Sequence, residues 1–466
     1  MDALLNFVKT ANGYLADYIL IVLLVGVGLL FTIMTKFVQI RSFGEGMKRV
    51  FGGIKLFGGK NKSGLTSFQA LATAIAAQVG TGNIVGASGA ILTGGPGAIF
   101  WMWIIAFLGM ATIYAEAVLA QETRVKDANG EVHGGPVYYI KKAFPNGFGK
   151  FLAGFFSVAL ILALGFMGCM VQSNSIAEAS CSAFGADYKQ WGWIVGIVIA
   201  VVSAFIFLGG IQRIASVTEK LVPLMACLFL VGGLAVLIAN ITVIPQTFGM
   251  IFKYAFTPEA IIGGTFGAAI KTAISQGAKR GLFSNEAGMG STPHAHAQAN
   301  VEKPHDQGVV AMIGVFIDTF VVLTMTALVV ISTLYTNGST AWQGVAKTNA
   351  MQTAFTTALP FLGQFGSIFV AVCLLFFAFS TILGWNFFGK INVQYLFKNS
   401  KVATAVYSVI AIVFIFLGTL ASNDLVWELT DFFNYLMVIP NAIALIALSK
   451  LVAKNAKNAK NKNDKK

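Results

Sequence analysis

The sequence predicts an all-α polytopic membrane protein with eleven transmembrane helices. Charged residues make up 11% of the 466 residues, hydrophobic residues 56%, and the mean hydropathy is +0.75. Soluble domains carry about 25% charged residues. Apolar runs close to the roughly 20 residues that span a bilayer recur along the chain, and basic residues gather in alternate loops, as expected for cytoplasmic loops.

The first apolar run, 18–34, predicts an uncleaved leading helix. It is too long for the core of a signal peptide and lacks a small-residue cleavage site. Seven Lys and Arg residues follow between positions 36 and 62. Segment 1–62 is therefore expected to hold an outer N-terminus, the leading helix and a basic cytoplasmic loop.

Ten further apolar runs predict the core of the bundle. If successive runs cross the membrane in opposite directions, all but five of the 32 Lys and Arg residues fall in cytoplasmic segments. This asymmetry predicts a multi-pass membrane protein with a cytoplasmic C-terminus. We expect the membrane to be a bacterial or archaeal-type plasma (inner) membrane. The expected runs are about 68–93, 97–120, 151–177, 191–209, 221–243, 259–280, 308–336, 361–389, 401–419 and 425–449.

The net charge of +13 belongs to the cytoplasmic loops and the tail, 451–466, rather than to a nucleic-acid surface. The tail is low in complexity and rich in Lys and Asn, which predicts disorder. Attraction to anionic lipid headgroups and a simple topological anchor are both compatible with it.

The ten core runs divide into two sets of five, 63–250 and 251–450, which predicts an inverted repeat. The motif Ser67-Phe68-Gln69-Ala70, followed by Gln78, has a counterpart in Thr265-Phe266-Gly267-Ala268, followed by Gln276. Five helices per set reverse the orientation of the second set. Each set then opens with a helix that we expect to be interrupted.

The interruption of the first core helix is predicted at 78–83, where Gln78, Gly80, Thr81, Gly82 and Asn83 occupy the centre of a span. Backbone groups freed there must be buried in protein or bind a ligand. N–H groups after a break at Val79 suit a carboxylate, and carbonyls before it suit a cation or an ammonium group. A continuous, glycine-rich helix packed closely against its neighbours is the alternative.

The equivalent break in the sixth core helix is predicted at 273–277, around Ala273, Ser275, Gln276 and Gly277. Lys271 falls within this span and should face a cavity or a partner, with Asp318 and Glu116 as candidates, either as a structural pair or in coupling.

Two adjacent hydroxyls, Ser380 and Thr381, lie in the otherwise apolar eighth core run. Together with carbonyls at a helix end they suit sodium, which takes oxygen ligands, without burying a net negative charge. In the alternative, each hydroxyl bonds its own helix backbone. Trp385 and Asn386 are placed to line the inner end of the pathway.

No catalytic or metal constellation is predicted. The histidines near position 300 fit no helical ligand spacing, and the four cysteines suggest neither a metal site nor a disulfide framework. Nucleophile-elbow, phosphate-loop and Rossmann patterns are missing from the sequence. We therefore expect neither an enzyme nor a cofactor.

Two long motifs carry a resemblance to a known family. The stretch GGPGAIFWMWI, 94–104, closing with Gly109, and the stretch GLFSNEAGMGS, 281–291, resemble signatures of the alanine or glycine:cation symporter family (sodium:alanine symporter). With the VGTGN break, the resemblance extends over nearly the whole chain.

The resemblance implies a leucine-transporter-like fold and import of alanine, glycine or a similar small neutral amino acid with sodium. It implies a sodium site made by the carbonyls of Ala76 and Val79 and the hydroxyls of Ser380 and Thr381. It also implies a substrate site with the carboxylate at the N–H groups of Thr81 and Gly82, and the ammonium near Gln78 and 273–275. Proton coupling through Lys271, Asp318 or Glu116 is the alternative, and a channel or a membrane-embedded enzyme is more remote. The preferred amino acid and the oligomeric state stay open.

Overall fold

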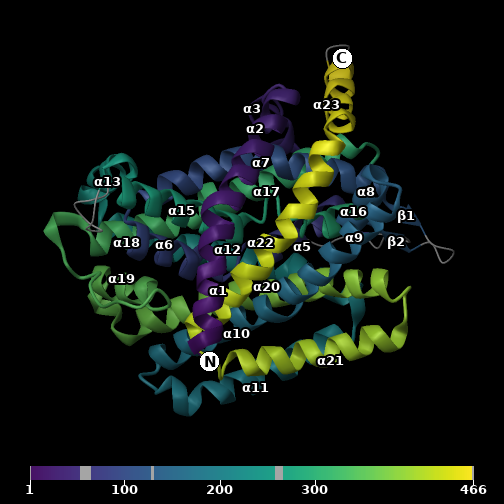
Figure 1. Ribbon diagram of the computed structural model, residues 1–466. Helices are drawn as coiled ribbons and strands as arrows, with labels where there is room; N and C mark the ends of the chain where they lie inside the picture. Colours follow the sequence, from purple (N-terminus) through teal and green to yellow (C-terminus); the bar gives the residue numbers. More distant parts are fainter. Residues whose placement is uncertain (1, 53–64, 127–130, 258–265, 464–466) are drawn as a thin grey trace.

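The computed structural model describes residues 2–52, 65–126, 131–257 and 266–463, and nearly all of them are helical (Figure 1). In this part of the chain nine helices are long and apolar enough to cross a membrane. The pair α5 (Ser67–Gln78) and η2–α6 (Gly82–Gly94), bent by 45°, adds a tenth. Helix α15 (Phe266–Asn285), which carries three basic residues, is not among them. The all-α membrane class is confirmed, whereas the count of eleven spans is not.

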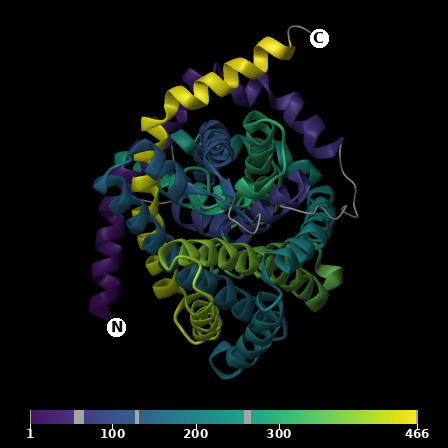
Figure 2. The same cartoon turned by 90° about the vertical axis from the view of Figure 1, so that its right-hand side faces the viewer.

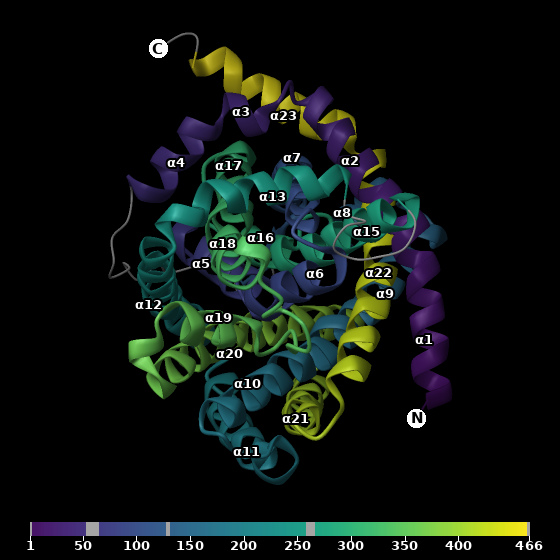
Figure 3. The ribbon, with the colours of Figure 1, turned by 90° about the vertical axis from the view of Figure 1, so that its left-hand side faces the viewer.

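The leading helix begins well before the predicted position 18. Helix α1 (Asp2–Tyr14), the π-helical turn η1 (Leu15–Leu20) and α2 (Ile21–Met34) follow one another without a break. Lys36 and Phe37 then adopt left-handed φ angles of 55° and 56°, which ends the helix. Two short helices follow, α3 (Val38–Arg41) and α4 (Phe43–Phe51), and the whole segment wraps around the outside of the bundle (Figure 3).

The first half of the core contains the broken helix and four further spans. Helix α5 begins with a capping box in which Thr66 and Gln69 satisfy each other's backbone N–H groups. A two-stranded antiparallel hairpin separates the second and third spans. The remaining elements are α7 (Ala98–Thr123), β1 (Val125–Lys126), β2 (Val132–His133), α8 (Pro136–Ala143), α9 (Gly147–Leu160), η3 (Ile161–Gly168), α10 (Cys169–Ala183), α11 (Tyr188–Phe207), α12 (Gly210–Ala239), η4 (Ile241–Val243) and α13 (Ile244–Phe256).

The second half follows the same pattern of long helices joined by short ones. After α15 come α16 (Pro293–Gln298), α17 (Pro304–Val315), η5 (Phe316–Leu323), α18 (Thr324–Leu334), η6 (Thr336–Gly338), α19 (Ala350–Ala358), η7 (Pro360–Leu362), α20 (Gln364–Leu396), α21 (Lys401–Gly418), α22 (Asn423–Ala447) and α23 (Ser449–Asn463).

The C-terminal tail is helical as far as Asn463, so the prediction of disorder over 451–466 is wrong for its described part. Val452 and Ala456, one helical turn apart in α23, are buried where the helix packs against α2, α7 and α17. Asn455 Nδ2 donates to Glu122 Oε1 of α7 at 3.0 Å. Apolar contacts and this hydrogen bond together hold α23, which lies along the outer edge of the bundle (Figure 2).

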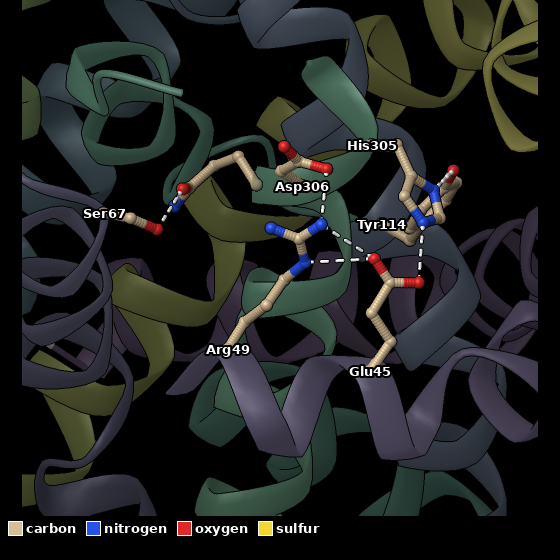
Figure 4. Close-up of polar contacts among 7 residues, drawn as sticks. Glu45, Arg49, Ser67, Tyr114, His305 and Asp306 are labelled. Carbon is tan, nitrogen blue, oxygen red and sulfur yellow. Dashed lines mark hydrogen bonds and ion pairs between the residues drawn. The ribbon is translucent and has the colours of Figure 1, made fainter. Parts of the chain in front are cut away.

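Helix α4 is tied to the start of α17 by a polar network (Figure 4). Arg49 contacts both Glu45 and Asp306 at 2.9 Å. His305 Nε2 lies 3.4 Å from Glu45 Oε2, and its Nδ1 lies 2.8 Å from Tyr114 Oη of α7. Burial opposes ionisation of Glu45, but Arg49 and His305 beside it hold its pKa below the usual value. The leading segment is thereby fastened to two core helices.

Candidate functional site

The first core helix is interrupted inside the predicted segment. Helix α5 ends at Gln78, Val79 is extended (φ −80°, ψ 91°), and a new helical segment begins at Gly82. The N–H of Gly80 donates to Asn83 Oδ1 at 2.9 Å, and the N–H of Thr81 donates to Gln172 Oε1 at 3.2 Å. The freed backbone groups are thus buried and bonded by side chains.

The two glycines of the break admit neighbouring helices. A Cβ added at Gly80 would lie 2.3 Å from Thr381 Oγ1, and one at Gly82 would lie 3.0 Å from Ser284 Cα and 3.1 Å from the Phe283 ring. The alternative of a continuous helix is therefore wrong, although the close packing that it invoked is present. The helix is broken, and its glycines allow close packing.

Five oxygen atoms, from α5, from Val79 just after it and from α20, converge beside the break. Thr381 Oγ1 lies 2.9 Å from the Ala76 carbonyl oxygen and 3.4 Å from that of Val79, and Ser380 Oγ lies 3.3 Å from the Ala76 oxygen. Both hydroxyls also contact the Phe377 carbonyl, at 2.8 and 3.0 Å. Uncharged oxygens in such a cluster are suitable ligands for a hard cation.

The bonds from both hydroxyls to the Phe377 carbonyl are the alternative drawn from the sequence, in which each hydroxyl bonds its own helix backbone. The same hydroxyls also approach the carbonyls of Ala76 and Val79, so both arrangements are present. Phe377 was not among the ion ligands predicted from the sequence.

Several polar atoms around the break are buried without a partner among the described residues. They are Gln78 Oε1, Thr81 Oγ1, Gln172 Nε2 and Trp427 Nε1. Native proteins leave few such atoms unpaired, so they mark the place for a polar ligand or water. Gln172 of α10 and Trp427 of α22 were not predicted, because nothing local distinguishes them.

Aromatic rings close around this polar patch. The ring of Phe283 lies 4.7 Å from that of Trp427 and 5.7 Å from that of Trp385, centroid to centroid. All three side chains are almost fully buried. Phe283 places this aromatic group directly against Gly82 of the break.

The predicted position of the sixth-helix break is wrong. Helix α15 continues through 273–277 to Asn285, and the irregular segment is 286–292, followed by α16. Positive φ angles occur at Glu286 (57°), Gly288 (95°) and Gly290 (78°). Gly288 and Gly290 adopt these left-handed angles without steric strain. Residues 273–277 lie within a regular helix, which does not break there.

The four residues proposed from that break lie elsewhere. Ser275 Oγ contacts Asp17 Oδ1 of the leading helix at 2.6 Å. Gly277 packs against Trp101, while Ala273 and Gln276 pack against Gly94.

Residues 283–285 face the first break instead. Gln78 Nε2 donates to the Asn285 carbonyl at 2.6 Å, so the side chain of Gln78 joins the two interrupted helices.

Two fully buried carboxylates hold the second irregular segment. Glu116 of α7 accepts from the N–H groups of Gly288 (3.2 Å) and Gly290 (3.0 Å) and from Asn441 Nδ2 (2.6 Å). Glu286 accepts from Trp385 Nε1 and from Ser291 Oγ. Each carboxylate is satisfied by neutral donors, the arrangement that makes a buried charge tolerable.

A third buried carboxylate, Asp318 of η5, lies next to the first break. It accepts from Asn83 Nδ2 at 2.6 Å, Ser284 Oγ at 2.8 Å and Thr319 Oγ1 at 2.9 Å. Lys271 contacts neither Asp318 nor Glu116. Its side chain is 56% exposed and pairs with Asp17 at 3.1 Å.

Charged residues cover one end of the site. Arg280 of α15 pairs with Asp431 of α22 at 3.0 Å, and its guanidinium lies 4.7 Å from the centre of the Trp427 ring. Lys347 Nζ lies 5.0 Å from the same ring and 3.8 Å from Asp424. Burial, and then the positive charge of Arg280, lower the pKa of Lys347 to about 8.

The three histidines near position 300 are buried. His294 contacts Asn392, His296 contacts Gln307, and His305 joins the α4 network. Within the residues described, no three His, Cys, Asp or Glu side chains gather as metal ligands.

Interrupted first and sixth core helices, meeting across a buried polar patch, define a membrane transporter with a leucine-transporter-like fold. The solved structure "MhsT in complex with L-phenylalanine" matches with a TM-score of 0.59 and 14% identity, covering 85% of this chain and 100% of the other.

The chain belongs to the sodium:alanine symporter family, whose sequence pattern matches residues 1–466. It is 42% identical to the sodium/alanine symporter AgcS of Methanococcus maripaludis over 96% of this chain and 95% of that one. It is 38% identical to the putative sodium/proton-dependent alanine carrier protein YrbD of Bacillus subtilis over 96% of this chain and 90% of the other. The protein is accordingly a secondary active amino-acid transporter and not an enzyme.

Proposed function

We propose that this protein imports alanine, glycine or a similarly small neutral amino acid together with sodium, by alternating access. It would do so in the plasma membrane, with its N-terminus outside and its C-terminus in the cytoplasm. The observation that carries the proposal is the cluster of five oxygens from Ala76, Val79, Phe377, Ser380 and Thr381. A sodium ion among them would join α5 to α20 and fix the geometry of the first break.

The amino acid would bind beside this ion. Its carboxylate would take the N–H groups of Thr81 and Gly82, at the start of a helical segment where the helix dipole favours an anion. Gln172 would then release the Thr81 N–H and donate from Nε2, which has no partner now. The ammonium group would meet Gln78 Oε1. The surrounding aromatic rings favour a hydrogen or methyl side chain over a larger one.

The driving force would come from the sodium gradient and the membrane potential. Moving one charge through 100 mV supplies about 2.3 kcal/mol. The Arg280–Asp431 pair, which links α15 to α22, would be broken and remade as the outer end opens and closes.

The deciding experiment is uptake of radiolabelled alanine, glycine and serine into proteoliposomes. Concentrative uptake should require an inward sodium gradient and favour the smaller substrates. Uptake that is equal with and without sodium would refute sodium coupling.

Proton coupling is the second candidate, favoured by the buried carboxylate of Asp318 at the break. If protons are coupled there, uptake should proceed in sodium-free buffer under an inward proton gradient, and Asp318→Asn should abolish that uptake. If sodium is the coupling ion, a proton gradient alone should drive nothing. Asp318→Asn should then leave the requirement for sodium in place.

A further inference from the structure

A set of exposed basic residues lies away from the candidate site, on α3, α4 and α23. These helices are neighbours at one edge of the bundle (Figures 1 and 3), and α4 and α23 both pack against α17. Six of the exposed cations form no ion pair with a described residue, and together they make up a basic band. They are Lys36, Arg41, Lys48, Lys450, Lys454 and Lys457.

In α23 the cations form a single stripe. Lys450, Lys454 and Lys457 follow one another at i, i+4 and i+7 spacing, which places them on one face of the helix. Val452 and Ala456, on the opposite face, are buried against the bundle. Among the described side chains of α23, no large apolar one is exposed. The stripe therefore faces outward as a polar surface that suits charged groups rather than hydrocarbon.

In α3 and α4 the cations alternate with exposed apolar side chains. Phe37 is 50% exposed, Ile40 63% and Phe51 52%, and the exposed cations Arg41 and Lys48 lie between them in the sequence. Apolar and cationic side chains on one exposed segment are typical of a helix at the boundary between acyl chains and headgroups. This combination favours a membrane surface over a nucleic acid, which would leave the apolar groups uncovered.

Both segments begin where the chain leaves the bilayer. Ile33, 66% exposed near the end of α2, precedes Lys36 by three residues, and Ile446, 48% exposed near the end of α22, precedes Lys450 by four. An exposed isoleucine of a spanning helix faces hydrocarbon, and one helical turn advances about 5 Å along the axis. The first cation of each segment is thus at the depth of the lipid headgroups.

The nearby acids leave the basic band with an excess of positive charge. Arg49, beside the band, pairs with both Glu45 and Asp306 at 2.9 Å. Glu122 accepts from the neutral amide of Asn455 at 3.0 Å. Cations clustered without acidic partners attract an anionic partner from outside the chain.

We propose that the basic band binds the anionic headgroups of the lipids around the protein. The lipid phosphates accept hydrogen bonds from the lysines and from Arg41, while Phe37, Ile40 and Phe51 contact the upper part of the acyl chains. In the proposed orientation these lipids belong to the cytoplasmic leaflet, whose anionic headgroups attract basic segments next to spanning helices.

Lipid bound there would brace two core helices. Helix α4 is tied to α17 by the Arg49–Asp306 pair, and α23 is tied to α7 by the bond from Asn455. Helix α17 leads into η5, which holds Asp318, and α7 carries Glu116. The segments held by lipid are therefore attached to helices that carry buried carboxylates around the two breaks.

The first test measures lipid binding to the detergent-solubilised full chain by native mass spectrometry. Phosphatidylglycerol and phosphatidylcholine with identical acyl chains are titrated together, and the wild type should bind phosphatidylglycerol more tightly. Each lysine near an anionic headgroup accounts for about fivefold in affinity. The triple variant Lys450→Gln, Lys454→Gln, Lys457→Gln should therefore bind phosphatidylglycerol about 100-fold more weakly, with phosphatidylcholine binding unchanged. Replacing the same three lysines by Arg should preserve the preference.

The matched control is Lys142→Gln, Lys150→Gln, Lys401→Gln, which removes the same charge at exposed lysines outside the basic band. It should bind phosphatidylglycerol as the wild type does. An equal loss in this control, or a wild type that binds both lipids equally, would overturn the proposal. Inorganic phosphate should displace phosphatidylglycerol no more than sodium chloride does at equal ionic strength. Stronger displacement would identify a site for free phosphate instead.

The second test needs no variant, so it does not depend on how a mutant folds. The wild type in lipid nanodiscs is cross-linked with an anionic lipid or a zwitterionic lipid that carries the same photoreactive group on its headgroup. Peptides that contain 36–51 and 449–459 should take up at least about fivefold more of the anionic lipid. Equal labelling by the two lipids, or labelling concentrated on other basic peptides such as 141–150, would refute the site. Neither test involves transport, so both judge the basic band even if the protein fails to carry alanine.

Discussion

Replacing Thr381 by valine tests the proposed sodium site most directly. The substitution keeps the branched shape of the side chain and removes one oxygen. That oxygen now lies 2.9 Å from the Ala76 carbonyl oxygen, 3.0 Å from that of Phe377 and 3.4 Å from that of Val79. It is therefore central to the cluster, and a bound ion would lose one of five ligands.

The expected magnitude follows from that loss. A hydrogen-bonding group that serves a charged partner contributes about 1.5–3 kcal/mol, and each 1.4 kcal/mol corresponds to about tenfold in affinity. The sodium concentration for half-maximal uptake should therefore rise about 10- to 100-fold. The maximal rate at saturating sodium should fall much less.

The assay is radiolabelled alanine uptake into proteoliposomes over a range of sodium concentrations, with choline keeping ionic strength constant. Thr381→Ser retains the oxygen and should stay near the wild type. Thr326→Val is the matched control, because Thr326 is fully buried and its hydroxyl has no partner among the described residues. A sodium curve for Thr381→Val within twofold of the wild type, at equal protein abundance, would refute the site.

Three further substitutions test the surroundings. Gly82→Ala should abolish uptake while the protein still reaches the membrane, because the new Cβ would press on Ser284 Cα at 3.0 Å; normal uptake would show that the helices separate easily. Arg280→Gln should cost about 3–5 kcal/mol in thermal unfolding, because it leaves Asp431 buried without a counter-charge; adding Asp431→Asn should recover most of the loss, and no recovery would contradict the pairing. The pKa of Lys347 is lowered from 10.5 to about 8, so the folded protein disfavours its charged form. The free energy of unfolding should rise by up to about 3 kcal/mol between pH 8 and 10.5, and Lys347→Gln should remove that rise; an equal rise in the variant would rule out Lys347 as its source.

The first break and the hydroxyl pair could be predicted because their signals are local. Glycines and polar side chains in the centre of a span cannot be accommodated by an ordinary lipid-facing helix. The hydroxyls of Ser380 and Thr381 are likewise out of place in an apolar run. The structure brings these two segments together, whereas their roles in binding stay predictions.

The second break was misplaced because the internal repeat was taken to fix its depth. The matching Phe, Ala and Gln residues mark corresponding helices, but the irregular backbone occurs where Gly288 and Gly290 permit left-handed angles. Basic residues within α15 obscured the extent of the helix. Lys271 and Arg280 are compensated by Asp17 and Asp431, residues remote in sequence whose pairing only the fold reveals.

The misjudged tail has a comparable cause. Its composition resembles that of disordered segments, yet Val452 and Ala456 are buried against the bundle and Asn455 bonds Glu122 of α7. Gln172 and Trp427 escaped notice for the same reason, since Gln172 meets Thr81 and Trp427 meets Gly86 only in the folded chain. Composition describes a segment by itself, whereas these contacts depend on the neighbour.

Helix α20 carries the hydroxyls of the proposed ion site and two contacts to the neighbouring segment 286–294 on one rod. Thr381 and Asn392 lie about 16 Å apart along its axis, at a rise of 1.5 Å per residue, within an uninterrupted helix of 33 residues. Trp385 bonds Glu286, and Asn392 bonds His294. Thermodynamic linkage between two such places is reciprocal. Whatever factor a sodium ion at Thr381 applies to the breaking of these two bonds, their breaking must apply to the affinity for sodium.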